Sequence, residues 1–242
     1  MTSVSLLHTA DMHSRLTAEA AQQLREVREQ HQALLLDSGD AIGALNVTVR
    51  RSEPIIELMN AAGYTAMAIG NREYFFRKRG MLHKTHSAAF VMLSANIQPV
   101  QGNMGHIKRW TMVTAPDGSP VGLFGLMPTM IAPGSWVERL SDMRFLPWEE
   151  AAQQAVAELR GQVDWLIALS HLGQEHDQRL MELFPEIDVI LGGHSHPQAT
   201  EIEQMSGALA SYPRPYAKEA VLITLSRQQG TTHYDSRAIE LL

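Results

Sequence analysis

The sequence predicts a layered α/β fold in which strands and helices alternate along the chain. Short apolar runs alternate with amphipathic stretches of helical period. Hydrophobic residues make up 45% and charged residues 19% of the 242 residues, which is ordinary globular composition. Metal-binding types of side chain recur directly after the apolar runs, where an open α/β sheet usually binds its ligands. We therefore expect packed strands with helices outside and one chemically active edge.

The first third of the chain predicts three strands and two helices. The expected strands are residues 4–8, 33–36 and 66–69, and the first expected helix is 16–30. Thr17 is a suitable cap for that helix, because its hydroxyl can accept a hydrogen bond from a free N–H of the first turn. Ser52-Glu53-Pro54 is expected to open the second helix and Gly63 to close it.

The rest of the chain is first richer in strands and then alternates again. Strands are expected at residues 89–94, 107–113 and 121–127, with a Pro116-Asp117-Gly118-Ser119 turn before the last. After these come a helix at 148–160, a strand at 165–170, a helix at 174–184, a strand at 189–191, and two or three strands from Ala208. Because no repeat, low-complexity segment or linker interrupts this pattern, residues 1–242 are predicted to form one domain.

The charge and cysteine content exclude several classes of protein. A formal net charge of -6 and a pI near 6.0 argue against a general nucleic-acid binder. The absence of cysteine excludes disulfides, cysteine-ligated zinc and thiol chemistry. The first residues lack a basic segment followed by a long apolar one, and no apolar run has the length of a membrane span. We expect a cytoplasmic protein with no membrane partner.

Seven side chains that can bind a metal follow the predicted strands. They are Asp11, His13, Asp40, Asn71, His171, His194 and His196. Each is a weak signal alone, but two metal ions that share a carboxylate need about seven ligands of this kind. Nitrogen and oxygen ligands without thiolate favour Mn²⁺, Fe, Zn²⁺ or Ni²⁺ over Ca²⁺. The sequence thus predicts a site for two divalent metal ions, with Mn²⁺ preferred.

The order of these motifs resembles the calcineurin-like metallophosphoesterase superfamily, which has D-x-H, G-D, G-N-x-E, H and G-G-H-S-H in that order. Within it, the stretches "LLHTADMHSRL" and "AMAIGNREYF" are similar to the catalytic domain of the 5'-nucleotidase branch. That branch usually has H-T-N-D-x-H-G and A-x-x-x-G-N-H-E-F-D, and Ala10 stands here in place of the first Asn. The resemblance, from residue 6 to about 225, implies a four-layer fold with two packed mixed β-sheets flanked by helices.

The resemblance also implies roles for the seven residues. One metal would be held by Asp11, His13, Asp40 and His196, and the other by Asp40, Asn71, His171 and His194. Asp40 would bridge the two ions, and a hydroxide between them would attack phosphorus. The implied activity is hydrolysis of a phosphate ester of a small molecule such as a nucleotide, with Asn71, Arg72 and His171 as the expected catalytic residues.

Two positions depart from the family pattern. The family has a His after the Asn, resembling a general acid, and an Asp three residues later that orients it. Here Arg72 and Phe75 take those places, and the family's C-terminal nucleotide-binding domain has no counterpart in these 242 residues. Arginine has a pKa above about 12 and cannot protonate a leaving oxygen, whereas general acid catalysis is worth about 10²- to 10⁴-fold. We expect poor leaving groups such as ribose 5'-oxygen to react slowly, and aryl esters or pyrophosphate bonds to react better.

Four residues are candidates for substrate binding, namely Arg72, Phe75, Tyr212 and Arg214. The stretch "SYPRPYAKE" resembles the family's G-x-Y-G-[RK]-Y segment, which predicts Tyr212 or Arg214 at the rim of the site. The alternative is a turn made rigid by its prolines. Residues 77–79, Arg-Lys-Arg, either attract a polyphosphate or oligonucleotide or form a solvated helix face.

Two further functions remain open at this point. The chain can be read as a weakly active or inactive relative that binds metal or a nucleotide and acts through a partner, because the His and Asp pair is lost. It can also be read as a homo-oligomer or complex in which another subunit supplies the missing acid.

Overall fold

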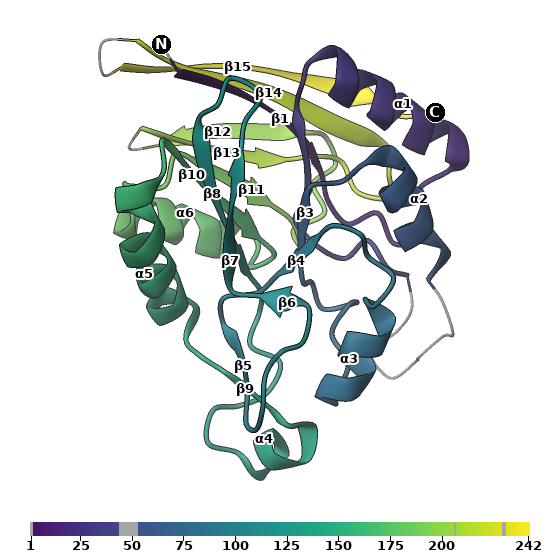
Figure 1. Ribbon diagram of the computed structural model, residues 1–242, viewed down its shortest axis with the longest axis vertical. Helices are drawn as coiled ribbons and strands as arrows, with labels where there is room; N and C mark the ends of the chain where they lie inside the picture. The colour runs from purple at the N-terminus through teal and green to yellow at the C-terminus, as the bar shows by residue number, and fades with distance from the viewer. Residues whose placement is uncertain (1, 44–52, 206, 229–230) are drawn as a thin grey trace.

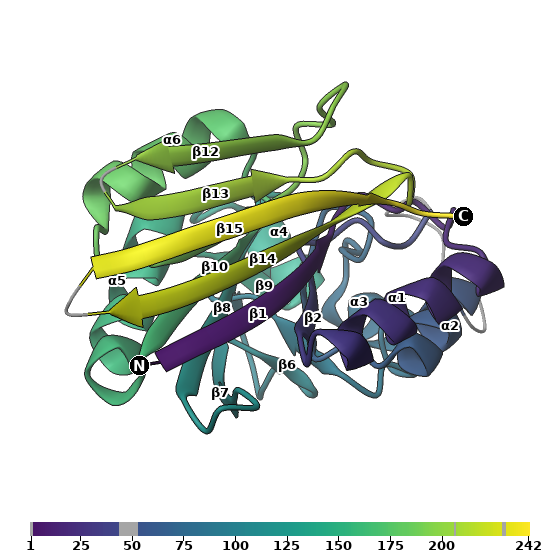
Figure 2. The ribbon, with the colours of Figure 1, turned by 90° about the horizontal axis from the view of Figure 1, so that it is seen from above.

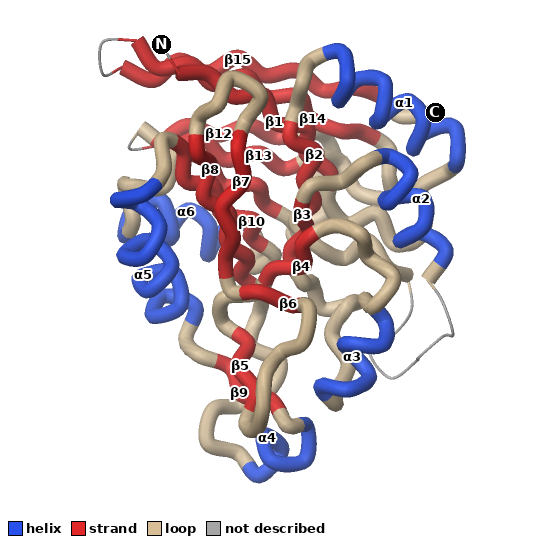
Figure 3. Tube along the Cα trace, viewed as in Figure 1, coloured by secondary structure: helices blue, strands red, loops and turns tan. Residues whose placement is uncertain are grey.

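The computed structural model describes residues 2–43, 53–205, 207–228 and 231–242. Two mixed β-sheets pack face to face, and helices cover both outer faces (Figure 1). Helices α1, α2 and α3 lie on one side, and α5 and α6 lie on the other (Figure 3). The four-layer arrangement predicted from the sequence is therefore confirmed.

The first sheet has seven strands in the order β15-β14-β1-β2-β3-β4-β6. Their bounds are β1 Thr2–Thr9, β2 Leu34–Asp37, β3 Ala66–Ala68, β4 Val91–Leu93, β6 Ile107–Lys108, β14 Glu219–Gln228 and β15 Thr231–Glu240. Strands β1 to β6 of this sheet run parallel, and β14 joins β1 antiparallel. Figure 2 shows β1, β14 and β15 side by side along one end of the molecule.

The second sheet has six strands in the order β12-β13-β11-β10-β8-β7. Their bounds are β7 Trp110–Thr114, β8 Pro120–Leu126, β10 Trp165–Ser170, β11 Val189–Gly192, β12 Glu201–Met205 and β13 Ala208–Tyr212. A small separate pair joins β5 Ile97–Pro99 to β9 Met143–Phe145. The helices are α1 Ala18–Gln30, α2 Pro54–Ala62, α3 Lys78–Lys84, α4 Trp136–Ser141, α5 Trp148–Leu159 and α6 Gln174–Leu183, and a 3-10 turn covers Arg160–Gln162.

The apolar runs are continuous because both faces of their strands are buried. In β1, Leu6 points into the core between the two sheets, whereas Leu7 points into the core beneath α1 and α2. A third core lies between the second sheet and helices α5 and α6, and it includes Ala168 of β10. Alternate residues of one strand thus serve two cores. Because β1, β2 and β3 run parallel, their carboxyl ends lie at the same edge of the sheet.

Several local predictions are confirmed by the structure. The Thr17 side chain accepts a hydrogen bond from the N–H of Ala20 at the start of α1. Gly63 ends α2 in the left-handed conformation with a φ of 79°, as expected of a glycine that closes a helix. Ser52, predicted within the opening of this helix, lies outside the described residues, and Glu53 precedes Pro54 as the cap residue.

The strand predicted at residues 107–113 is wrong as a single element. It is divided into β6 and β7, which belong to different sheets. Arg109 stands at the division, where its guanidinium donates to the carbonyl of Ala95 and to the side chain of Gln154. The short helix α4 and the short strands β5, β9 and β12 were not anticipated, whereas α3 begins within residues 77–79, where a helix face was one of the two interpretations. Within the described residues, no helix combines the length and apolar character that a membrane span requires.

Candidate metal centre

The seven predicted ligands all follow strands whose carboxyl ends meet at one edge. Asp11 and His13 follow β1, Asp40 follows β2, Asn71 follows β3, His171 follows β10, and His194 and His196 follow β11. Two groups of side chains come close enough to hold a metal ion: Asp11, His13 and His196, and Asp11, Asp40 and His171. The structure thus brings together residues that are up to 185 positions apart.

The loops that carry the ligands have an unusual backbone. Asp11, His13, Asp40, His194 and His196 all have positive φ values, from 47° to 72°. Non-glycine residues in this region carry strain of about 1 kcal/mol or more, and such strain clusters at functional sites. The N–H of Asp11 donates to the carbonyl of Gly39 at 2.9 Å, and the N–H of His13 donates to that of Asp40 at 3.0 Å. These bonds hold the first two loops together.

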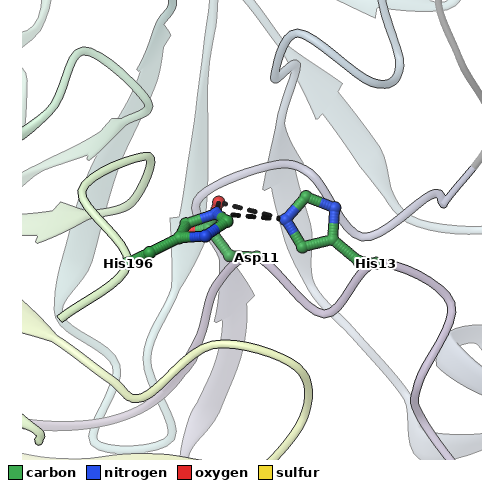
Figure 4. A group of neighbouring side chains, drawn as sticks. All are labelled: Asp11, His13 and His196. Carbon is green, nitrogen blue, oxygen red and sulfur yellow. Dashed lines mark hydrogen bonds and ion pairs between the residues drawn. The ribbon is translucent and has the colours of Figure 1, made fainter. Parts of the chain in front are cut away.

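The first group, which we call the open half, comprises His13 and His196 beside Asp11. Figure 4 shows the two imidazoles pointing toward each other at the Asp11 carboxylate. The Nε2 atoms of His13 and His196 are 3.1 Å apart, and Nε2 of His196 is 3.0 Å from Oδ1 of Asp11. The His13 and His196 side chains are 11% and 35% exposed. The hydrogen bond to Asp11 raises the pKa of His196 against the opposing effect of burial.

The second group is Asp11, Asp40 and His171. Asn71 lies beside its histidine, and we call Asp40, Asn71 and His171 the buried half. Nδ1 of His171 donates to the carbonyl of Ser38 at 2.9 Å, which leaves the lone pair of Nε2 facing the site. Nε2 of His171 lies 3.2 Å from Oδ1 of Asn71 and 3.3 Å from Oδ1 of Asp40. Three lone-pair atoms that face one another need a cation between them, so this donor set fits a divalent metal ion.

In the absence of a metal ion, a proton on the imidazole of His171 can supply the positive charge instead. Burial alone would lower the pKa of His171, but the hydrogen bond and the charge of Asp40, with the charges of Asp11 and Glu73, raise it to about 9. Burial likewise opposes ionisation of Asp40, but its contacts with His171 and with the N–H of Arg72 lower its pKa. The buried half therefore has a strong affinity for positive charge.

Asp11 is the residue common to both groups, whereas the family resemblance gives the bridging role to Asp40. The carboxylate of Asp11 also accepts the backbone N–H of His194 at 2.8 Å, through Oδ2. The ring of His194 lies beside that of His171, with 5.1 Å between the centroids, but it belongs to neither group. The bridging role of Asp40 and the metal-binding role of His194 remain predictions.

Glu73 is a site residue for which the sequence predicted no role. Its buried carboxylate accepts the backbone N–H groups of Asp40 and Gly70, each at 2.9 Å, and that of Ile42 at 3.0 Å. Burial and the nearby charge of Asp40 raise the pKa of Glu73 to about 7. Glu73 thereby ties the Asp40 loop to the Asn71 loop. The G-N-x-E motif was the signal that could have identified it.

Gly70 is required by the same close packing of these two loops. A Cβ atom there would lie 2.4 Å from Oδ1 of Asp40, closer than nonbonded atoms approach. Any other residue at this position would displace a candidate metal ligand.

The position of Arg72 was left open by the sequence and is given by the structure. A pocket of about 180 Å³ at the metal edge is lined by His13, Arg15, Gly43, Arg72, His196 and Tyr216. The backbone N–H of Arg72 also donates to Oδ1 of Asp40 at 2.7 Å. Arg72 therefore lines the pocket at the ligands. Arg15 and Tyr216 line it too and were not anticipated, because neither belongs to a ligand motif.

The other three substrate candidates lie in different places. Tyr212 is only 1% exposed and packs in the core beside α6, so its predicted place at the rim is wrong. Arg214 lines a neighbouring pocket of about 250 Å³ that shares His196 and Tyr216 with the metal pocket, and it pairs with Glu219 at 2.9 Å. Phe75 lines a separate pocket beside α3.

Comparison with known proteins finds phosphoesterases, both among family models and among individual relatives. The model for calcineurin-like phosphoesterases matches residues 4–198. The chain is 29% identical over 246 aligned residues to a snake venom 5'-nucleotidase of Gloydius brevicauda, covering 87% of this chain and 40% of that protein. It is 31% identical to a 5'-nucleotidase of Bos taurus, covering 80% of this chain and 38% of that protein. The chain thus spans about two fifths of the length of these relatives.

Solved structures share the fold at lower identity. A 5'-nucleotidase precursor from Thermus thermophilus superposes with a TM-score of 0.79 at 23% identity, covering 99% of this chain and 55% of that one. The NAD nucleotidase of Haemophilus influenzae gives a TM-score of 0.80 at 20% identity, covering 99% of this chain and 56% of that one. In both cases the present chain matches only part of the longer protein.

Proposed function

This chain belongs to the calcineurin-like phosphoesterase family, and we propose that it hydrolyses phosphate esters with two divalent metal ions held at the edge described above. The family uses a dinuclear divalent metal centre, and the donor set of the buried half fits such an ion. We propose Asp11, His13, Asp40 and His196 as ligands of one ion, and Asp40, Asn71, His171 and His194 as ligands of the other. Nitrogen and oxygen donors support Mn²⁺ as the metal, with Zn²⁺, Fe or Ni²⁺ as alternatives.

The bound ions would supply an activated water and would neutralise charge on the phosphate oxygens. The chain's own residues contribute position and protonation state. The carbonyl of Ser38 fixes the tautomer of His171, and Glu73 holds the backbone of Asp40 in place. The neutral amide of Asn71 suits a site that already contains two aspartates and must still accept an anion.

The place of Arg72 in the metal pocket limits the range of substrates that we propose. It lines the metal pocket at the position where the family has a histidine resembling a general acid. Its guanidinium can donate hydrogen bonds to a phosphate oxygen or to a departing oxyanion, but it keeps its own proton. We therefore propose that the enzyme acts on esters whose leaving group needs no protonation, such as aryl phosphodiesters and aryl monoesters, and slowly on nucleoside 5'-monophosphates.

A second function is favoured by the same substitution. The loss of both the histidine and the aspartate that orients it would suit a relative that binds metal or a nucleotide and acts through a partner. The retention of all seven ligand residues in the sequence supports catalysis, because a purely structural site has no chemical need for two adjoining metal positions. We further propose that residues 1–242 work as a single catalytic domain.

One titration tests the proposed function. The protein is stripped of metal and supplied with increasing Mn²⁺, while hydrolysis of an aryl phosphodiester, an aryl phosphomonoester and adenosine monophosphate is followed in parallel. We expect activity to saturate at two metal ions per chain and to be greatest on the aryl esters. Equal rates on adenosine monophosphate and the aryl monoester would refute the role assigned to Arg72. Binding of two ions without turnover would favour the binding protein.

A further inference from the structure

A second pocket lies beside α3 and shares no lining residue with the metal pocket. Its volume is about 600 Å³, and its lining includes Phe75, Arg77, Arg79, His83, His86 and His106. These residues come from the segment before α3, from α3 and the turn after it, and from the approach to β6. Helix α3 lies at the lower right of Figure 1, on the outer face of the seven-stranded sheet.

The two arginines give this pocket its charge. Arg77 and Arg79 line it, whereas Lys78 between them is directed elsewhere, where it pairs with Asp142 and donates to the carbonyl of Gln101 at 2.6 Å. None of the described lining residues is acidic. The Arg-Lys-Arg run is thus divided, and two of its three cations share one concave surface. On a chain of net charge -6, two such cations without a lining carboxylate create a locally positive surface that attracts anions.

The ring of Phe75 provides a fixed aromatic surface in the same pocket. A Cβ atom on Gly80 would lie 2.2 Å from Cδ1 of Phe75, so the ring rests directly on the helix backbone. The ring of Phe76 contacts it with 4.8 Å between the centroids. A planar ring held in this way is a stacking surface for another planar ring.

The histidines supply hydrogen-bonding groups rather than a metal site. Nδ1 of His86 donates to the carbonyl of His83 at 2.6 Å, which leaves its Nε2 as an acceptor. Nε2 of His106 bonds the hydroxyl of Thr85 at 2.8 Å. Within the described part of the chain, these histidines do not form a group close enough to hold an ion. An imidazole nitrogen that is free of protein partners can hydrogen-bond to the polar edge of a nucleobase.

We propose that this pocket is a second binding site, distinct from the metal centre, and that its ligand is a nucleotide. The base would stack on Phe75, and the phosphate would lie between the guanidinium groups of Arg77 and Arg79. The combination of an aromatic surface with two cations and no carboxylate selects a planar ring that carries a phosphate over either part alone. This site does not depend on the hydrolytic activity proposed above.

Photolabelling with 8-azidoadenosine 5'-monophosphate tests the site on the Mn²⁺-loaded, full chain. We expect label in peptides that contain residues 75–86 or His106, and we expect adenosine monophosphate to compete better than adenosine or inorganic phosphate. Label found only in peptides that contain His13, His196 or Tyr216 would overturn the proposal, because the nucleotide would then bind only at the metal pocket. Equal competition by adenosine monophosphate and inorganic phosphate would overturn the role of Phe75.

Substitutions in the Arg-Lys-Arg run provide a matched comparison. Arg77→Gln with Arg79→Gln should weaken nucleotide binding about tenfold or more, because charge-assisted hydrogen bonds to phosphate are lost. Lys78→Gln removes the same charge from the neighbouring position and should leave the affinity unchanged. Arg79→Gln alone, at an exposed helix position, should give an intermediate loss in a chain whose folding is undisturbed. Equal affinities for the wild type, the arginine variants and Lys78→Gln would refute the site.

Discussion

The two halves of the candidate metal centre are built differently. In the buried half, the side chains of His171 and Asp40 are 0% and 3% exposed, and backbone groups hold the ligands in place. In the open half, His13 and His196 face the pocket and are 11% and 35% exposed. Their partners are side chains, namely Asp11 and, at 3.5 Å from Nδ1 of His196, the hydroxyl of Tyr216. Backbone groups therefore hold the side chains of the buried half, whereas the imidazoles of the open half are positioned by other side chains.

This difference separates two tasks. Ligands that are already ordered lose little conformational entropy when an ion binds, so the buried half should bind its metal more tightly. The open half shares its pocket with Arg72 and Arg15, so it should decide which substrates are accepted. Substitutions in and around the two halves can separate these tasks.

The largest effect is expected from His171→Ala. Loss of a metal that supplies several kcal/mol of transition-state stabilisation should lower kcat/KM by about 10³-fold or more. Wild-type protein at about 100 times the metal Kd should gain about 2.7 kcal/mol of stability, and His171→Ala should lose more of this gain than His196→Ala. Thermal unfolding with and without Mn²⁺ measures it. The exposed His176→Ala is the control, and a larger loss in His196→Ala would reverse the assignment of the halves.

The buried carboxyl of Asp177 should make the stability of the protein depend on pH. Burial raises the pKa of this carboxyl to about 7, although the hydroxyl of Ser170 at the end of β10 donates to it. Because the folded-state pKa lies above the unfolded value of about 3.9, the folded chain holds a proton that the unfolded chain releases. Stability from this group is present below about pH 4 and is lost as the pH rises to about 7, at about 1.4 kcal/mol per unit.

Asp177→Asn removes this titratable group, so the stability of the variant should fall less as the pH rises. As the pH rises from about 4 to about 7, the unfolding free energy of the wild type should fall relative to that of Asp177→Asn. Denaturant unfolding of the metal-free proteins at several pH values measures it. A difference that stays constant over this range would show that Asp177 titrates normally.

Glu73→Gln should have a smaller effect, through the position of Asp40. Its carboxylate accepts three backbone N–H groups, and an amide offers only one oxygen to them. Loss of such an outer contact typically weakens metal affinity about 10- to 100-fold. Mn²⁺ titration calorimetry measures it, with the exposed Glu57→Gln as the matched control. An unchanged affinity would mean that the loop holds Asp40 without Glu73.

Tyr216→Phe should have the smallest effect. The hydroxyl of Tyr216 is 3.5 Å from Nδ1 of His196, which is a long and weak hydrogen bond. We expect kcat/KM to fall about threefold or less, as for the loss of a weak contact. A fall of about 10²-fold, growing with the basicity of the leaving group, would instead identify Tyr216 as a general acid.

The alternation of strands and helices and the polar side chains at the strand ends could be predicted because they rest on local patterns, whereas the four layers came from the family resemblance. Buried strands leave continuous apolar runs, and the ligands of the metal edge follow those runs directly, as His171 does after β10. Residues 107–113 look like one strand because both of its parts are strands, and the transfer between sheets at Arg109 is a tertiary event. Such a transfer leaves no periodic signal in the sequence.

The parts of the site that escaped prediction depend on side-chain direction. Tyr212 occurs in a motif that suggests the rim, yet its ring packs against Gly192 and the core beside α6. Glu73 acts on backbone groups of two loops that are distant in sequence, which only the folded chain brings together. The position of Arg72 likewise depends on the meeting of the two loops, because its backbone N–H donates to Asp40 and its residue lines the metal pocket.

The role proposed for Arg72 is tested by comparing the wild type with Arg72→His. The value of kcat/KM is measured for both proteins on a series of aryl phosphodiesters whose leaving groups increase in pKa. We predict a steep decline for the wild type and a shallower one for Arg72→His, with the gain approaching about 10²-fold on the most basic leaving group, as general acid catalysis would give. Parallel declines for the two proteins would contradict the claim that Arg72 sets the leaving-group range.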